Sequence, residues 1–81
     1  MKIRVLAFAS AADALGAAER EIEIPAGASL AALGELLCRE HPGLARLWPR
    51  LALAVDGEVR QGDLPLANGS EVALLPPVSG G

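Results

Sequence analysis

The chain ends in two glycines, Gly80 and Gly81. This ending carries the α-carboxylate on a strip of backbone without side chains, which can enter a narrow tunnel that any Cβ would block. The reactive group indicated by the pattern is therefore the carboxylate of Gly81, not a side chain. Because a carboxylate is a poor electrophile, we expect it to need activation, most simply adenylation with ATP by a partner enzyme. The mixed anhydride could then accept sulfur, giving a thiocarboxylate, or accept an amine or a thiol.

No phosphate-binding loop accompanies this ending in the sequence. Gly57, Gly62 and Gly69 are isolated turn glycines and match neither a P-loop nor a dinucleotide-binding fingerprint. We therefore expect that the chain binds no cofactor and that ATP is used by the activating enzyme.

The other reactive side chains favour structural roles. Cys38 is expected to be a buried or half-buried thiol without a function. His41 follows the predicted main helix without the neighbours of a metal or acid–base site, and Trp48 is expected to cover the core. The acidic residues between positions 56 and 63 lack the spacing of a calcium loop, so no metal site is predicted.

The segment before the glycines is suited to presenting them. Pro76 and Pro77 cannot donate a hydrogen bond to a sheet, so they end the last strand and stiffen the exit of the chain. The six residues 76–81 reach at most about 20 Å. We therefore divide the chain into a folded domain at residues 1–75 and an extended tail at residues 76–81.

Hydrophobic periodicity predicts the elements that position this tail. The alternating segments are strands and the segment of helical period is a helix, with strands at residues 2–9, 19–24, 51–55, 58–60 and 71–75 and a main helix at residues 30–40. Ser29 is its expected N-cap. Short helical turns are expected at residues 10–16, with Ser10 as cap and Gly16 as stop, and at residues 43–48. The pair Asp56 and Gly57 predicts a tight hairpin. The resulting fold class is α+β, with a mixed sheet packed on one main helix.

One helix covers one face of a sheet, yet the alternation leaves two apolar faces. The face expected to meet the helix carries Ile3, Val5, Ile22, Ile24, Leu53, Val55, Val72 and Leu74. The opposite face carries Leu6, Phe8, Ala52, Ala54, Ala73 and Leu75. A contiguous apolar outer face predicts a partner surface. The alternative is that loops, or the helical turn at residues 10–16, fold over it.

Composition excludes several classes of partner. The net charge is −3 and the seven basic residues are scattered, which disfavours nucleic-acid binding. The longest apolar run inside the domain, residues 51–55, is too short for a membrane span, and the N-terminus does not match a signal peptide. The single cysteine fits a reducing, cytoplasmic location.

The order of elements, the segment Asn68-Gly69-Ser70-Glu71-Val72 and the ending Leu75-Pro76-Pro77-Val78-Ser79-Gly80-Gly81 closely resemble the small subunit of molybdopterin synthase, a ubiquitin-like, β-grasp sulfur carrier. The resemblance implies that a ubiquitin-activating-like enzyme adenylates Gly81, which becomes a thiocarboxylate. It also implies a heterotetramer with the large subunit, in which sulfur passes to cyclic pyranopterin monophosphate to form molybdopterin.

The resemblance also assigns site residues. Four residues would be inserted into the large subunit, namely Val78, Ser79, Gly80 and Gly81. Five would lie at the partner interface, namely Phe8, Ala73, Leu75, Pro76 and Pro77. The large subunit would supply the catalytic side chains, so none is assigned here.

Three other functions remain open from the sequence. The chain could carry sulfur for thiamine or cysteine synthesis, or be a ubiquitin-like modifier joined to lysines of other proteins. It could also be a binding module that uses its apolar sheet face and has an inert tail.

Overall fold

The computed structural model describes residues 1–77, and within them the secondary structure follows the predicted periodicity closely. The elements are β1 (Lys2–Ala7), α1 (Ser10–Leu15), β2 (Glu19–Glu23), α2 (Leu30–Glu40), α3 (Pro42–Leu47), the 3-10 helix η1 (Trp48–Arg50), β3 (Ala52–Val55), β4 (Glu58–Arg60) and β5 (Glu71–Leu75). Every predicted strand and the main helix are present.

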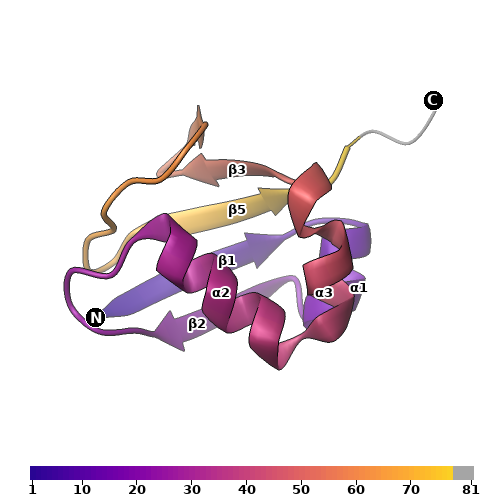
Figure 1. The fold of residues 1–81 in the computed structure, drawn as a ribbon, viewed down its shortest axis with the longest axis horizontal. Helices are drawn as coiled ribbons and strands as arrows, with labels where there is room; N and C mark the ends of the chain where they lie inside the picture. The colour runs from indigo at the N-terminus through magenta and orange to yellow at the C-terminus, as the bar shows by residue number, and fades with distance from the viewer. Residues whose placement is uncertain (78–81) are drawn as a thin grey trace.

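The strands form one mixed sheet in the order β2-β1-β5-β3-β4. The first and last strands of the chain, β1 and β5, lie side by side and parallel in its centre, with Val5 opposite Val72 (Figure 1). The pairs β1–β2, β3–β5 and β3–β4 are antiparallel. This is the β-grasp arrangement that the resemblance to the sulfur carrier implies.

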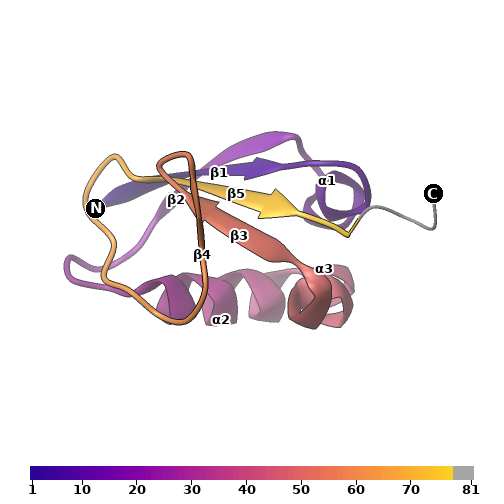
Figure 2. The same cartoon turned by 90° about the horizontal axis from the view of Figure 1, so that it is seen from above.

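The core lies between this sheet and α2. Leu33 and Leu37 of α2 are fully buried, as are Ile3, Val5, Val72 and Leu74 of the two central strands. Burial of each such side chain contributes about 1.5–3 kcal/mol. Helices α2 and α3 lie on the same side of the sheet, so the structure has two layers (Figure 2). Ser29 caps α2 as predicted, because its Oγ accepts the backbone N–H of Ala32 at 3.2 Å.

The region after β1 differs from the prediction. The strand ends at Ala7 rather than at residue 9, because Ala9 adopts a positive φ of 50° and the N–H of Ala11 donates to the carbonyl of Phe8 at 3.0 Å. Ser10 is not the cap of α1: it is the first helical residue, and no side chain caps this helix. Gly16 ends α1 in the left-handed conformation, as predicted.

The connection from α2 to β3 is more helical than predicted. Pro42 does not only stop α2: it starts α3, where its fixed φ suits the first turn and its missing N–H costs nothing. Helix α3 places Leu44 in the core with no exposed surface. The 3-10 helix η1 follows, so β3 begins at Ala52 instead of residue 51.

Asp56 and Gly57 form the predicted tight turn between β3 and β4, with φ values of 49° and 86°. Both angles are positive, as a type I′ turn requires, and only glycine and a few polar residues adopt them readily.

None of the helices in residues 1–77 is long and apolar enough to cross a membrane.

Candidate functional site

The tail of the chain starts from a central strand of the sheet. Strand β5 pairs with β1 on one side and with β3 on the other, where Leu75 lies opposite Ala52. Its inward side chains, Val72 and Leu74, are fully buried. The C-terminal end of β5 points to the end of the molecule where α1 and α3 lie (Figure 1). The root of the tail is therefore fixed on both sides.

The turn before β5 is tied to the start of the chain. The side-chain oxygen of Asn68 accepts the backbone N–H of Lys2 at 2.7 Å, and the N–H of Gly69 donates to the carbonyl of Lys2 at 2.7 Å. The N–H of Arg4 donates to the carbonyl of Ser70 at 2.9 Å. These bonds set the register of the two central strands. They involve residues 68–70, which belong to the segment that carries the family resemblance.

The residues predicted for the outer face of the sheet lie there. The outer-face patch consists of Leu6, Phe8, Ala52, Ala54, Ala73 and Leu75. The register places Ala54 opposite Ala73, and Ala73 next to Leu6. Phe8 is 48% exposed and Ala52 is exposed, whereas Leu6, Ala73 and Leu75 are half-buried and Ala54 is buried. Helix α1 does not cover this patch, because its buried residues Ala11 and Leu15 belong to the core on the other side of the sheet.

The structure describes all five residues that were predicted at the partner interface. Phe8, Ala73 and Leu75 belong to the outer-face patch, Pro76 is half-buried and Pro77 is exposed. The structure therefore places Phe8, Ala73 and Leu75 in the outer-face patch, and Pro76 and Pro77 follow Leu75 directly. The predicted inserted residues Val78, Ser79, Gly80 and Gly81 lie outside the described residues.

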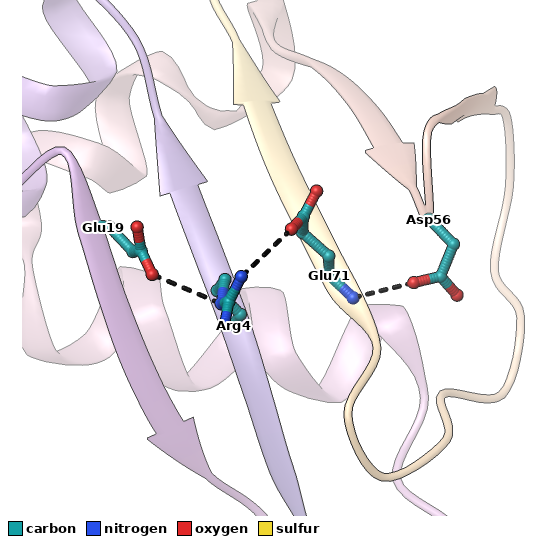
Figure 3. A network of polar contacts seen from close by, with 4 residues as sticks. All are labelled: Arg4, Glu19, Asp56 and Glu71. Carbon is teal, nitrogen blue, oxygen red and sulfur yellow. Dashed lines mark hydrogen bonds and ion pairs between the residues drawn. The ribbon is translucent and has the colours of Figure 1, made fainter.

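The other half of the outer face is charged. Arg4 on β1 lies between two carboxylates: its Nε is 3.2 Å from Glu19 Oε2, and its Nη1 is 3.6 Å from Glu71 Oε2 (Figure 3). Lys2 pairs with Glu21 at 3.8 Å. Asp56 accepts the backbone N–H of Glu71 at 2.9 Å. These side chains are largely exposed, so each pair contributes at most about 1 kcal/mol.

The acidic alternation of β2 thus has local partners that the sequence does not reveal. Glu19 and Glu21 were expected to be solvated, and they are exposed, but each also neutralises a cation of β1. The outer face as a whole has an apolar half near the tail and a charged half near the N-terminus.

The remaining candidates occupy structural positions. Cys38 is half-buried, and burial raises the pKa of its thiol. His41 joins α2 to α3. Trp48 packs against the core as predicted. Within residues 1–77 no group of three or more His, Cys, Asp or Glu side chains could hold a metal ion.

Sequence reasoning missed two features near Trp48. Val59 on β4 is 64% exposed; it lies opposite Ala54 of the outer-face patch and lines the same pocket as Trp48. Gly34 lies in the middle of α2, where the Trp48 indole takes the space of its missing Cβ: a Cβ built there would be 2.6 Å from Trp48 Cζ2. No local signal in the sequence reveals that contact.

Comparison with known proteins agrees with this geometry. The ThiS family model matches residues 5–81. The molybdopterin synthase sulfur carrier subunit of Homo sapiens is 36% identical over 83 residues, covering 99% of this chain and 94% of the relative.

Two solved structures share the fold over the full length of both chains. SAMP1, a small archaeal modifier protein from Haloferax volcanii, has a TM-score of 0.87 at 26% identity. A chain in the complex of subunits 1 and 2 of molybdopterin-converting factor from Helicobacter pylori has a TM-score of 0.74 at 26% identity. Because the family match covers nearly the whole chain and a full-length relative is 36% identical, the chain belongs to the ThiS family and is a relative of the molybdopterin synthase sulfur carrier subunits.

Proposed function

We propose that this chain is the sulfur carrier subunit of a molybdopterin synthase and that Gly81 bears the sulfur. An activating enzyme uses ATP to adenylate the carboxylate of Gly81, with release of pyrophosphate. A sulfur donor then displaces AMP and leaves a thiocarboxylate, which gives its sulfur to cyclic pyranopterin monophosphate on the way to molybdopterin. The observation that carries this proposal is the family match, which runs through Gly81, together with a sulfur carrier subunit as a full-length relative.

The geometry of the described residues supports a carrier with a rigid root. Strand β5 is held in the centre of the sheet, and Pro76 and Pro77 follow it directly. A pocket in a partner protein would therefore receive the tail from a fixed point and in a fixed direction, and residues 76–81 span up to about 20 Å.

The large subunit would dock on the outer-face patch. Phe8 is a large exposed apolar side chain at the end of the sheet from which the tail leaves, and Leu75 and Ala73 continue the apolar surface. A known complex between subunits 1 and 2 of molybdopterin-converting factor supports such a partner. In this proposal the large subunit contributes the catalytic side chains, and the reaction takes place in the reducing cytoplasm.

The test is the intact mass of the untagged protein. The protein is incubated with ATP, a cognate adenylating enzyme and a sulfur donor. We expect a mass gain equal to the replacement of one oxygen by sulfur, and fragmentation should place it at Gly81. An unmodified mass, with an enzyme shown to be active on another carrier, would overturn the proposal.

Two tail variants serve as controls in the same assay. Deletion of Gly81, or addition of one residue after it, should abolish sulfur loading and sulfur transfer while leaving the thermal unfolding curve unchanged. Loading of either variant would show that the reactive carboxylate is not the one proposed.

A second candidate function is attachment to other proteins. It is favoured by the TM-score of 0.87 to SAMP1, a small archaeal modifier protein. A modifier would use the same adenylated Gly81 but pass it to lysine side chains. Conjugates of higher mass in cell lysate, absent when Gly81 is deleted, would establish this activity, whereas loaded carrier without conjugates would exclude it.

A further inference from the structure

We propose that the corner of the molecule where η1, β3 and β4 meet binds an acidic, extended segment of a partner protein. This edge pocket has a volume of about 500 Å³ and is lined chiefly by Trp48, Arg50, Leu51, Leu53, Val59 and Arg60. The pocket shares Ala52 with the outer-face patch, and Ala52 lies opposite Leu75. The inference does not depend on the sulfur chemistry.

The pocket offers an apolar surface that the fold leaves accessible. Trp48 is half-buried, since it packs on Gly34 and the core and also lines the pocket. Val59, at 64%, is the more exposed of the two large hydrophobic side chains that stand out among residues 1–77. An aromatic ring beside an exposed aliphatic side chain is a surface on which a partner's apolar side chain can gain contact area.

The charge of the pocket is opposite to that of the chain. Arg50 has no carboxylate within 4.0 Å among the described residues. Arg60 is 3.3 Å from Glu58, but these side chains are 48% and 72% exposed, so the pair is weak and easily exchanged. The net charge of the chain is −3, yet the charged residues that line this pocket are the two arginines. Charge complementarity therefore selects an acidic partner.

Asp63, a carboxylate near Trp48, forms no ion pair with these arginines among the described residues. Asp63 lines a smaller neighbouring cavity, and Trp48 lines this cavity too. Its Oδ1 accepts the backbone N–H groups of Ala31 and Leu64, each at 2.9 Å. Asp63 Oδ1 therefore already accepts hydrogen bonds from the first turn of α2 and from the loop beside it.

The neighbouring strand favours an extended occupant. Strand β4 is the last strand of the sheet on this side, so one of its edges has no neighbour in the sheet. An extended segment can lie along such an edge, with alternate side chains reaching the pocket. Phe8 lies beyond β1, with β5 and β3 between β1 and β4, so an occupant of the edge pocket leaves Phe8 free.

The experiment uses the intact protein and a phage-displayed library of random twelve-residue peptides. We expect the selected peptides to carry Asp or Glu around an apolar residue. Trp48 is the only tryptophan, so binding of a synthetic selected peptide should shift its fluorescence directly. The affinity should fall as the salt concentration rises.

The double variant Arg50→Glu/Arg60→Glu should weaken binding by about tenfold or more. Arg39→Glu is the matched control: Arg39 is exposed on α2 and does not line the pocket, so its reversal should change affinity less than about twofold. Circular dichroism should show that all variants remain folded.

Several outcomes would overturn the proposal. One is a selection without acidic enrichment, and another is equal loss of binding in the Arg39→Glu control. Binding that is abolished by Phe8→Asp and not by the arginine variants would move the site to the outer-face patch. A shift of Trp48 emission with AMP but with none of the peptides would identify a nucleotide site instead.

Discussion

Ala9 has a backbone conformation that is unfavourable for an alanine, with φ 50° and ψ −126°. This residue ends β1 and turns the chain into α1, and the turn leaves Phe8 exposed at the edge of the outer-face patch. A positive φ of this kind costs an L-residue about 1–3 kcal/mol. The strain therefore lies directly beside the side chain that we propose for docking.

Replacement of Ala9 by glycine tests this strain. Ala9→Gly should raise the free energy of unfolding by about 1 kcal/mol, because relief of strain exceeds the added chain entropy of the unfolded state. Urea denaturation measures the change. Ala32→Gly, at an exposed position of α2, should instead lower stability by about 1 kcal/mol. A fall in stability for Ala9→Gly would contradict the assignment of strain.

The thiol of Cys38 should react slowly. Burial raises its pKa above the ordinary value of 9.0, so the reactive thiolate is scarcer at pH 8 than in a free peptide. The rate of alkylation by iodoacetamide should rise with pH to a midpoint above that of a model peptide. By linkage, this thiol favours the folded state below its unfolded pKa, and the contribution is lost as pH rises through the folded pKa.

Cys38→Ser should leave sulfur loading of Gly81 unchanged in the intact-mass assay, since the proposed chemistry does not use this thiol. Loss of loading in a variant that folds normally would give Cys38 a role that neither its burial nor its surroundings indicate.

At the scale of elements, α2 and η1 are in contact through Gly34 of α2 and Trp48 of η1. Glycine inside a helix costs about 1 kcal/mol relative to alanine, yet Gly34 lies in the middle of the longest helix. The indole of Trp48 fills the space beside it. The contact positions η1 against α2 and thereby shapes one wall of the edge pocket.

Gly34→Ala should therefore lower stability by about 1–3 kcal/mol, despite the better helix propensity of alanine, because the new Cβ would displace Trp48. The emission of Trp48 should also shift to longer wavelength. The double-mutant cycle with Trp48→Leu provides the control: in that background Gly34→Ala should become neutral or stabilising. An equal loss of stability in both backgrounds would mean that Trp48 is not the obstacle.

At the scale of the whole molecule, the two layers formed by residues 1–77 leave one sheet face without a helix in the described part of the chain. The outer-face patch and the fixed root of the tail lie at the same end of that face. A partner that docks there would hold the carrier and receive the tail in one binding event. The charged half, with Arg4 between Glu19 and Glu71, limits the apolar area and sets its boundary (Figure 3).

Phe8→Asp should weaken binding to a molybdopterin synthase large subunit by about tenfold or more, because a charge would replace a large apolar contact in the proposed interface. Isothermal titration calorimetry measures the affinity. Ala45→Asp introduces the same charge at an exposed position of α3 and should have little effect. Unchanged affinity for Phe8→Asp would remove the outer-face patch from the proposed interface.

Most of the fold could be predicted from the sequence because its signals are local. Alternation gives β5 its buried Val72 and Leu74 and its outer Ala73 and Leu75, and Ser29 caps α2 with its own side chain. Errors occurred where a local signal was ambiguous. Pro42 can stop one helix or start another, and nothing around Ala9 announces a positive φ.

The sequence by itself determined the chemical hypothesis and the two-faced sheet, since a terminal carboxylate and a period of two residues are properties of the chain. Only the tertiary structure decided which distant residues meet. Arg4 reaches Glu71 because β1 and β5 pair in parallel, and Trp48 reaches Gly34 because η1 packs on α2. The edge pocket likewise exists only where η1, β3 and β4 converge. Such contacts depend on packing between elements far apart in the chain, which no local pattern encodes.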